Sequence, residues 1–346
     1  MQQTIRRVKL AKRQGISQTE MNTFMRTEKH LMRYCAAALT LMITAVAVSA
    51  DTTTPNEWLD RMSMAVKTMN FEGTVIRRRD GLSEAVKVLH KIVDGVVHEK
   101  VVTQEGNGLE IIRIGNEVRY ILPDKKSVLV DHRNDDSALF STLPARDLRF
   151  GNEYDLSIVR EERVAGRQAL VLAIRPHDSY RYGHRIWLDS ETSFPLRTEL
   201  VAGDGALIEQ LKFVEIKLDS DISRTALKSS FSLAGYTWYS EPARSEVVDV
   251  ESQWISDELP AGFRLLSTTN EMMANSDVPV VHIVFSDGLA TVSVFIATNQ
   301  DGAVPENSAV GASSSYSVER NDCIITVIGK VPLATVRRIA VSMRQQ

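Results

Sequence analysis

Histidine, cysteine, serine and acidic residues could do chemistry in this 346-residue chain, but their spacing argues against an enzyme. The motifs G-x-S-x-G, H-E-x-x-H and C-x-x-C mark serine hydrolases, zinc proteases and dithiol sites. None of the three occurs in the sequence. Gly329-Lys330 resembles the end of a phosphate-binding loop, yet the glycine required five residues earlier is Ile324. The sequence therefore predicts no catalytic residue.

Six histidines follow residue 50, and none lies two or four residues from another, as a local metal site would require. They are His90, His98, His132, His177, His184 and His282. His90 and His98 flank a predicted hairpin turn and could approach each other. Two imidazoles alone lack the carboxylate or thiolate partners of a metal site, so surface positions on strands are favoured. Neither a metal nor another cofactor is predicted.

Two short polar runs need a separate interpretation. Pro176-His177-Asp178-Ser179 holds the residue types of a catalytic triad, but a triad converges from separate elements, so a polar turn is favoured. The run Arg77, Arg78 and Arg79 is either the solvated end of a strand or a site for an anionic head group. The second interpretation rests on the match between guanidinium and phosphate geometry.

The first fifty residues have the pattern of a secretory signal peptide. Basic residues precede an uncharged run over residues 34–50, which ends in Ala47-Val48-Ser49-Ala50. An uncleaved anchor is the alternative, although the run is short for a spanning helix, which needs about 20 residues. Met21, Met25 and Met32 are alternative start positions. We expect export and cleavage after Ala50.

Charge and cysteine content limit the classes of partner and the cellular compartment that we expect. Residues 1–50 hold eight of the 41 Lys and Arg residues and two of the 44 Asp and Glu residues, which leaves a net charge of −9 for the rest. Nucleic acid is not an expected partner, because phosphate neutralisation needs clustered cations. Cys323 is the only cysteine after residue 50, so no internal disulfide is expected, and its apolar neighbours indicate a small buried side chain. Export without disulfides fits the periplasm.

Strands dominate the elements that must position these residues. A helix is predicted after Pro55, because apolar residues from Trp58 to Met69 follow helical spacing. Asp80-Gly81 and Asp94-Gly95 are typical hairpin turns between the strands. Eleven strands are predicted, over residues 71–79, 85–93, 96–103, 109–114, 117–122, 127–131, 155–163, 167–175, 182–189, 195–202 and 206–218. Such a long antiparallel meander must curl, so we expect a half-open barrel, with one or two short helices within 137–148.

A second β-rich unit follows a change of composition. Residues 51–220 form the expected large domain, residues 221–246 a linker and residues 247–346 a smaller domain. The smaller domain is predicted to contain a long Gly/Ala/Ser-rich loop over 300–315 and to end in a helix after Pro332. Its six predicted strands are residues 247–254, 262–269, 278–286, 290–298, 316–320 and 323–331.

A half-open barrel with an apolar concave face is suited to binding an acyl chain. Candidate inward residues come from four strands before residue 125 and two strands after residue 180 of the predicted sheet. They are Phe71, Val75, Leu89, Ile112, Ile121, Ile186, Leu188 and Phe213. Ordinary core packing explains the same residues equally well, and the sequence leaves both interpretations open.

Several stretches of the chain are similar to one known family. They include MNFEGTV at residues 69–75, RIWLD at 185–189 with Pro195-Leu196-Arg197, LPAGF at 259–263 and SDGLATVSVF at 286–295. Together they resemble the RseB/MucB family of periplasmic regulators of sigma-E (AlgU-type) activity, over nearly all of residues 55–344. The Trp-Leu-Asp and Pro-Leu pattern also occurs in LolA/LolB lipoprotein carriers.

The resemblance implies a mainly β chain with a few helices (α+β), with a LolA/LolB-like unclosed β-barrel and a smaller C-terminal mixed α/β domain. It implies binding to the periplasmic domain of an RseA/MucA-type anti-sigma factor and its protection from site-1 proteolysis. It also implies release by a lipid or lipopolysaccharide ligand that enters the large domain. A homo-oligomer is left open. Candidate partner-binding residues, chosen from the motif and from exposed aromatic residues, are Tyr236, Trp238, Tyr239, Asp287, Gly288, Leu289 and Phe295.

Two other function classes stay open. A periplasmic lipid or lipoprotein carrier would need only the barrel, so the second domain argues against it. An exported hydrolase with an unrecognised site would show turnover on ester or glycan substrates. Asp287-Gly288 could also be nothing more than a hairpin turn.

Overall fold

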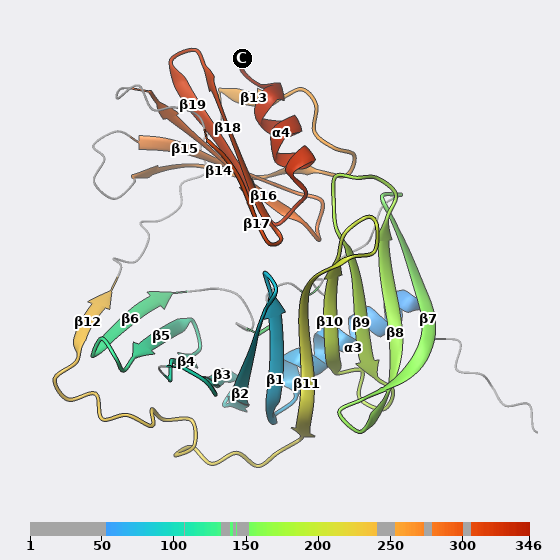
Figure 1. The fold of residues 1–346 in the computed structure, drawn as a ribbon, viewed down its shortest axis with the longest axis vertical. Coiled ribbons are helices and arrows are strands. Elements are labelled where there is room, and N and C mark those ends of the chain that lie inside the picture. The colour runs from blue at the N-terminus through green and yellow to red at the C-terminus, as the bar shows by residue number, and fades with distance from the viewer. Residues whose placement is uncertain are drawn as a thin grey trace, which may run out of the picture. The chain divides into compact units, whose positions relative to one another are not determined.

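The computed structural model describes residues 53–106, 108–132, 139–140, 143, 152–240, 253–272, 279–299 and 306–346. Residues 54–346 form one compact unit that contains a large sheet and a small sheet (Figure 1). We call residues 54–240 the large-sheet region and residues 253–346 the small-sheet region. The signal peptide predicted for residues 1–50 lies outside the described residues.

The chain enters the large-sheet region through helix α3 (Pro55–Thr68). Thr54 and Glu57 form a capping box, in which each side chain accepts a hydrogen bond from the other residue's backbone N–H. The buried side of the helix carries Trp58, Met62 and Val66 at helical spacing, which confirms the amphipathic helix that the sequence predicts.

The large sheet contains twelve strands in the order β12-β6-β5-β4-β3-β2-β1-β11-β10-β9-β8-β7. The two edge strands do not pair with each other, so the barrel is unclosed, as predicted. Its strands are β1 (Phe71–Arg79), β2 (Leu82–Val93), β3 (Val96–Thr103), β4 (Glu110–Ile114), β5 (Glu117–Leu122), β6 (Ser127–His132), β7 (Tyr154–Val164), β8 (Arg167–Pro176), β9 (Gly183–Asp189), β10 (Pro195–Val201), β11 (Leu207–Leu218) and β12 (Thr237–Ser240).

Tight turns join the consecutive antiparallel strands. Asp80 and Gly81, and likewise Asp94 and Gly95, all have positive φ between 52° and 79°. That left-handed conformation suits the twist of a two-residue hairpin, and it confirms the turns predicted at both positions. The first strand β1 pairs with β2 on one side and with β11 on the other, which joins the beginning of the sheet to its last meander strand.

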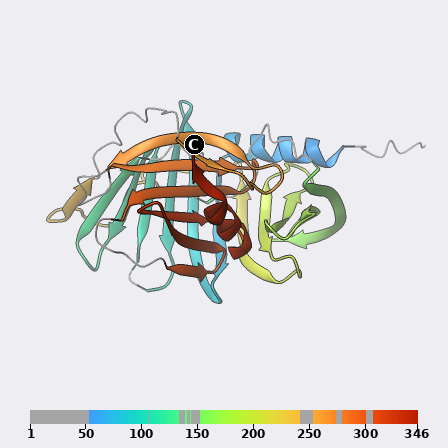
Figure 2. The ribbon, with the colours of Figure 1, turned by 90° about the horizontal axis from the view of Figure 1, so that it is seen from above.

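Strand pairing assigns each side chain of the large sheet to one of two faces, because directly opposed residues share a face. Val75 lies opposite Val86 of β2 and opposite Phe213 of β11. These residues pack in one cluster with Ala65 and Val66 of α3. We call this face the inner face and the opposite one the outer face. Figures 1 and 2 show α3 lying against the half of the sheet that contains β7 to β11.

Four phenylalanines fill the inner face next to α3. The ring centroids of Phe71 and Phe194 lie 4.8 Å apart, and those of Phe71 and Phe213 lie 6.0 Å apart. Phe140 packs on both Phe194 and Phe213. Tilted and edge-to-face aromatic pairs of this kind add to the free energy gained from burial. The sequence predicts Phe71 and Phe213 as inward residues, and both are fully buried there.

Gly73 allows β1 to approach β11 closely. A Cβ atom at this position would lie 2.4 Å from the carbonyl oxygen of Glu215 and 3.1 Å from the ring of Phe213. We expect Gly73→Ala to lower the free energy of unfolding by about 1–3 kcal/mol, because the backbone of β11 must shift. Urea denaturation measures this change. Gly203→Ala is the control, since no atom lies within 4 Å of the added Cβ, and an equal loss in both variants would contradict the prediction.

Residues 219–236 cross the outer face of β2 to β6, and we call them the covering segment. Ile222 and Leu227 pack on Leu89, while Phe231, Leu233 and Tyr236 pack on the cluster around Ile121. The segment then continues into β12, which pairs in parallel with β6. Residues 221–240 of the linker predicted at residues 221–246 therefore pack on the large sheet through apolar side chains and through β12. Residues 241–246 lie outside the described residues.

A buried ion pair fixes the covering segment to the sheet. The Lys100 ammonium lies 3.2 Å from the Glu110 carboxylate, and both side chains are at most 7% exposed. Lys100 Nζ donates to the Lys228 carbonyl oxygen at 2.7 Å, and Glu110 accepts from Ser229 Oγ and the Ser230 N–H. Burial alone would raise the pKa of Glu110, but these donors and Lys100 hold it below its usual 4.5.

The small-sheet region contains a six-stranded sheet, a pair of short strands and one helix. The apolar face of the sheet packs on helix α4 (Leu333–Ser342) through Val336, Ile339 and Ala340. The sheet strands, in spatial order, are β14 (Arg264–Met272), β15 (Pro279–Ser286), β16 (Thr291–Thr298), β19 (Cys323–Gly329), β18 (Ser313–Arg320) and β17 (Asn307–Val310). The short pair is β13 (Trp254–Ser256) with β20 (Met343–Gln345).

The structure corrects parts of the sequence prediction here. The loop expected at residues 300–315 contains β17 and the start of β18, because Asn307–Val310 pairs with Ser313–Tyr316 despite weak strand propensity. The sequence predicts Leu333 and Met343 on the apolar face of the last helix, but Leu333 is 43% exposed and Met343 lies in β20. Most of the strand predicted at 247–254 and of the helices predicted within 137–148 lies outside the described residues. No helix of the described residues is long and apolar enough to span a membrane.

Candidate functional site

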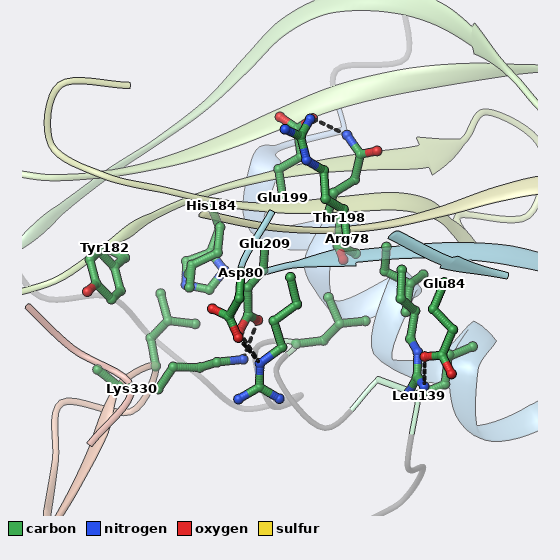
Figure 3. A pocket seen from close by; sticks show the side chains of 18 of the residues that line it. Arg78, Asp80, Glu84, Leu139, Tyr182, His184, Thr198, Glu199, Glu209 and Lys330 are labelled. Carbon is green, nitrogen blue, oxygen red and sulfur yellow. Dashed lines mark hydrogen bonds and ion pairs between the residues drawn. The ribbon is translucent and has the colours of Figure 1, made fainter. Parts of the chain in front are cut away.

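A cavity of about 850 Å³ opens between the inner face of the large sheet and the small-sheet region (Figure 3). Strands β1, β2, β10 and β11 contribute one wall, and the turn between β15 and β16 contributes another. Its volume lies within the range of about 300–1,000 Å³ for small-molecule sites. The apolar lining consists of Leu82, Leu139, Leu143, Leu200, Leu211 and Leu289.

Three cations of the cavity are paired with carboxylates, whereas Arg78, which also contributes to its lining, forms no ion pair among the described residues. Arg77 pairs with Glu84 at 2.6 Å, and Arg79 lies 3.5 Å from Glu209. Lys330, from the small-sheet region, also reaches Glu209, at 2.5 Å. Each of these three cations already has a carboxylate partner, so a lone anion would have to compete there with an acidic side chain. The arrangement favours a mainly apolar ligand over a free phosphate.

The three consecutive arginines of β1 do not act together. Arg77 and Arg79 face the cavity, because Arg77 lies opposite Glu84 and Arg79 reaches Glu209. Arg78 lies opposite Gln210 on the outer face. Figure 3 shows the same division for two carboxylates, since Glu199 and Glu209 point to opposite sides of their strands. Strand alternation therefore separates the candidate head-group residues into two faces.

His184 lines the cavity and has a strongly shifted pKa. Burial, together with the nearby Lys330 ammonium, lowers the pKa of His184 to about 4. The folded protein therefore holds His184 neutral, whereas the unfolded chain binds a proton below its ordinary pKa of 6.5. Since unfolding takes up a proton, stability falls as the pH drops from 6.5 towards 4.

We expect His184→Gln to reduce this acid sensitivity. The wild-type protein should lose about 1 kcal/mol of unfolding free energy per pH unit through His184 between pH 6.5 and pH 4, and the variant should not. Urea denaturation at several pH values gives the slope. His132→Gln, at an exposed strand end, is the control. Identical slopes in the wild type and His184→Gln would contradict the assignment.

Five of the eight predicted inward residues share the inner face. Phe71, Val75 and Phe213 belong to the α3 cluster, and Ile186 and Leu188 pack with Trp58, Leu59 and Met62 of the same helix. None of the five lines the cavity, because α3 and its neighbours already cover them. They form the base of the inner face, beneath the leucines that the cavity exposes.

The other three predicted inward residues lie on the outer face. Leu89 pairs with Lys100, which pairs with Ile112, and Ile121 pairs with Glu110. Because directly opposed residues share a face, Leu89, Ile112 and Ile121 lie beneath the covering segment. The structure does not bring these three to the cavity.

The SDGLATVSVF motif forms a contact between the two sheets. Asp287 lies in the β15–β16 turn, and its Oδ1 accepts the N–H groups of Leu289 and Ala290. Gly288 has a φ of 97°, which favours glycine. Leu289 packs on the cluster around Trp58 and Tyr154 of the large-sheet region. Asp287, Gly288 and Leu289, predicted as partner-binding residues, thus hold the chain's own two sheets together.

Arg181 is the centre of this contact, and sequence reasoning missed it. Its Nη1 donates to Asp287 Oδ2 at 2.7 Å, and its Nη2 donates to the Ala261 carbonyl oxygen at 2.6 Å. The Tyr154 hydroxyl donates to the same Asp287 oxygen at 2.8 Å. Burial, with the Asp287 carboxylate, raises the pKa of Tyr154. Both side chains of the Arg181–Asp287 pair are at most 1% exposed, and no local pattern in the sequence signals a partner 106 residues away.

The remaining candidate partner residues lie elsewhere. Trp238 and Tyr239 of the edge strand β12 are 48% and 55% exposed, whereas Tyr236 packs against the outer-face cluster. The Arg119 guanidinium lies 5.7 Å from the Trp238 ring. Phe295 of β16 stacks on His282 at 4.4 Å. Trp238 and Tyr239 are therefore the candidates that a partner can reach most directly.

The structure also places the other polar candidates. His90 is 1% exposed, stacks on Phe71 and lies 3.1 Å from Glu99, so the surface position predicted for it is wrong. His98 pairs with Lys91, on the other face from His90. Burial and Asp322 raise the pKa of the free, half-buried thiol of Cys323. Among the described residues, no group of three His, Cys, Asp or Glu side chains could hold a metal ion.

Comparison with known proteins identifies the family of this chain. MucB, the regulatory protein of sigma factor AlgU in Pseudomonas aeruginosa, is 29% identical over 315 residues, which are 88% of this chain and 95% of that protein. RseB, the sigma-E factor regulatory protein of Haemophilus influenzae, is 27% identical over 310 residues, 89% of this chain and 96% of that protein.

A solved complex of P. aeruginosa MucA and MucB shares the fold, with 29% identity and a TM-score of 0.64 over 84% of this chain and 99% of the solved chain. A second structure, of MucB with MucA(peri), has the same TM-score and covers 85% of this chain. The family model of the MucB/RseB N-terminal domain matches residues 54–231, and that of the C-terminal domain matches residues 248–344. The chain belongs to the MucB/RseB family.

Proposed function

We propose that this protein is a periplasmic regulator that binds the periplasmic segment of a MucA-type anti-sigma factor. By covering that segment it protects the anti-sigma factor from site-1 proteolysis and restrains the sigma-E response. The observation that carries the proposal is the family match across both sheet regions, together with the solved complexes of the relative MucB with MucA.

The exposed edge strand β12 is the contact that we propose for the partner. Among the described strands it pairs with β6 alone, so its other edge presents backbone N–H and C=O groups to an added strand. Trp238 and Tyr239, on opposite sides of this strand, are exposed, and aromatic side chains are enriched among the residues that dominate binding energy. An extended anti-sigma segment would add its backbone to β12 and pack on these two rings.

Calorimetric titration of the purified protein with the periplasmic segment of a MucA-type anti-sigma factor tests the proposal. We expect a saturable complex, and at least tenfold weaker binding after Trp238→Ser with Tyr239→Ser, because central aromatic contacts contribute about 2 kcal/mol or more. The matched control is Leu265→Ser with Leu266→Ser, two residues of β14 that are 54% and 55% exposed. If the wild-type protein did not bind the segment, the proposed regulatory function would be wrong.

The cavity of about 850 Å³ supports a lipid-type ligand as the signal that this regulator senses. Its leucines offer an apolar surface for an acyl chain, while the paired charges at the rim give polar contacts to a head group. We propose that an acyl chain of a lipid or of lipopolysaccharide enters here. Occupation next to Leu289 and Lys330 would act on the contact between the two sheets.

Repeating the titration with lipopolysaccharide tests the lipid proposal. We expect weaker binding of the anti-sigma segment when lipid is present, and a smaller lipid effect in Leu211→Gln. Leu207→Gln, on the same strand but outside the cavity lining, is the control. Stoichiometric bound lipid without any anti-sigma binding would instead indicate a lipid or lipoprotein carrier.

A further inference from the structure

Five basic residues gather on the outer face of the large sheet, outside the covering segment, and one of them, Arg78, also contributes to the lining of the cavity. They come from the adjacent strands β2, β1, β11, β10 and β9, and the pairing register places them close together. Lys212 lies directly opposite Arg197, and Arg78 flanks Ile76, which is the other neighbour of Lys212. We call this set the outer basic patch: Arg78, Lys87, Arg185, Arg197 and Lys212.

Three members of the patch have no acidic partner. Arg78, Lys87 and Lys212 form no ion pair with any residue that the structure describes. Arg185 and Arg197 share one carboxylate, that of Glu199, which also accepts from Gln210. The five cations therefore outnumber the two carboxylates beside them, Glu199 and Glu162, the second of which accepts a hydrogen bond from the Trp187 indole opposite Arg197.

The arrangement costs stability unless an anion lies on it. Like charges that face each other directly across a strand pair repel, as Lys212 and Arg197 do here. The patch also inverts the charge of its surroundings, since residues 51–346 carry a net charge of −9. Cations elsewhere in the large sheet are commonly paired, as Arg77 is with Glu84 and Arg167 with Asp189.

The position of the patch restricts what can bind to it. All five residues lie on strands whose two edges are already paired within the sheet, so a peptide cannot add there as a further strand. Adjacent strands are about 4.8 Å apart, so the patch extends roughly 20 Å across the sheet. A broad array of cations on a sheet face fits a surface with many anionic groups better than it fits one small anion.

We infer that the outer basic patch is a docking surface for an anionic phospholipid membrane. The phosphate groups of adjacent lipids would bind Arg78, Lys87 and Lys212, while Arg185 and Arg197 would turn from Glu199 towards the lipid. Charges farther than ~8 Å from the patch are largely screened by salt at physiological ionic strength. The inference goes beyond the proposed regulation, because it concerns where the protein resides and not which protein it binds.

Vesicle co-sedimentation of the purified protein tests this surface. We expect binding to equimolar phosphatidylglycerol and phosphatidylcholine vesicles, weakened by salt, and no binding to phosphatidylcholine alone. Each basic residue at a membrane surface contributes about 1 kcal/mol, or about fivefold in affinity. Arg78→Gln with Lys212→Gln should therefore weaken binding about 25-fold. The control is Lys67→Gln with Lys125→Gln, which removes the same charge from exposed positions outside the patch.

The outcomes separate the alternatives. Loss of binding in the patch variant and retention in the control supports the docking surface. Binding to neutral vesicles, equal losses in both variants, or no vesicle binding by the wild type would overturn it. If the patch variant weakens binding of the anti-sigma segment in solution but not binding to vesicles, the face binds an acidic protein, and the membrane assignment is wrong. Because the anti-sigma titration contains no vesicles, failure of one proposal is distinguishable from failure of the other.

Discussion

Arg181→Met should lower the free energy of unfolding by about 3–5 kcal/mol. The substitution leaves the Asp287 carboxylate buried with only the Tyr154 hydroxyl as a side-chain donor, and it removes the donor to the Ala261 carbonyl oxygen. Breaking one side of a buried ion pair is costly because the remaining charge stays away from water. Urea denaturation followed by tryptophan fluorescence measures the loss.

Two further variants show whether the effect belongs to this contact. Arg181→Lys keeps the charge but replaces the planar fork with one ammonium, so we expect an intermediate loss. Arg344→Met breaks an ion pair with Asp257 in which both side chains are about half exposed, 49% and 48%, and should cost less than about 1 kcal/mol. If Arg181→Met cost no more than Arg344→Met, the pair would not hold the two sheets together.

Glu110→Ala should also destabilise the protein by about 3–5 kcal/mol, through the covering segment. The change leaves the Lys100 ammonium without its carboxylate and removes the acceptor of Ser229 and Ser230. The Lys228 carbonyl oxygen and the Ser230 hydroxyl would still accept hydrogen bonds from Lys100. The loosening should therefore begin at the Ser229 hydroxyl and the Ser230 N–H, which lose their acceptor. Hydrogen exchange of the residue 219–236 backbone, with urea denaturation, checks both parts.

The same carboxylate predicts a pH dependence. The pKa of Glu110 is lower in the folded protein than its usual 4.5, so its contribution to stability is present above pH 4.5. That contribution is lost as the pH falls through the lower, folded pKa. Glu110→Gln should therefore be less stable than the wild type at neutral pH, and the difference should shrink in acid. Glu117→Gln, whose partner Arg119 is 37% exposed, is the control. A constant difference at all pH values would contradict the assignment.

Local patterns explain which parts of this fold the sequence predicts well. The bounds of β1 follow from apolar alternation that ends at Asp80-Gly81, and both signals lie within ten residues. The faces of Leu89 and Ile112 could not be assigned in the same way. Apolar side chains lie on both faces of β2 and β4, because the covering segment buries Leu89 and Ile112 on the outer one, and the sequence of that segment is typical of a polar linker.

The candidate site is harder to predict than the fold, because its residues come together through contacts between segments that are distant in the sequence. The turn at Asp287-Gly288-Leu289 can be predicted from the sequence. The partner of Asp287, Arg181, lies 106 residues away in an ordinary polar loop. The run Arg77, Arg78 and Arg79 reads as one cluster until the strand register places Arg78 on the outer face. Lys212 and Arg197 become neighbours only through that register, so the outer basic patch has no linear signature.

The pairing of β1 with β11 has a consequence for how the chain folds. The meander from β1 to β6 and the meander from β7 to β11 each consist of hairpins between consecutive strands, which form rapidly. The seam between Phe71 and Leu218 joins the ends of this long stretch and must close a large loop, so it is a high-contact-order, slow step. Until β11 arrives, β1 presents an unpaired edge that can pair with another chain. Newly synthesised molecules are thus most prone to aggregate in the interval before this seam closes.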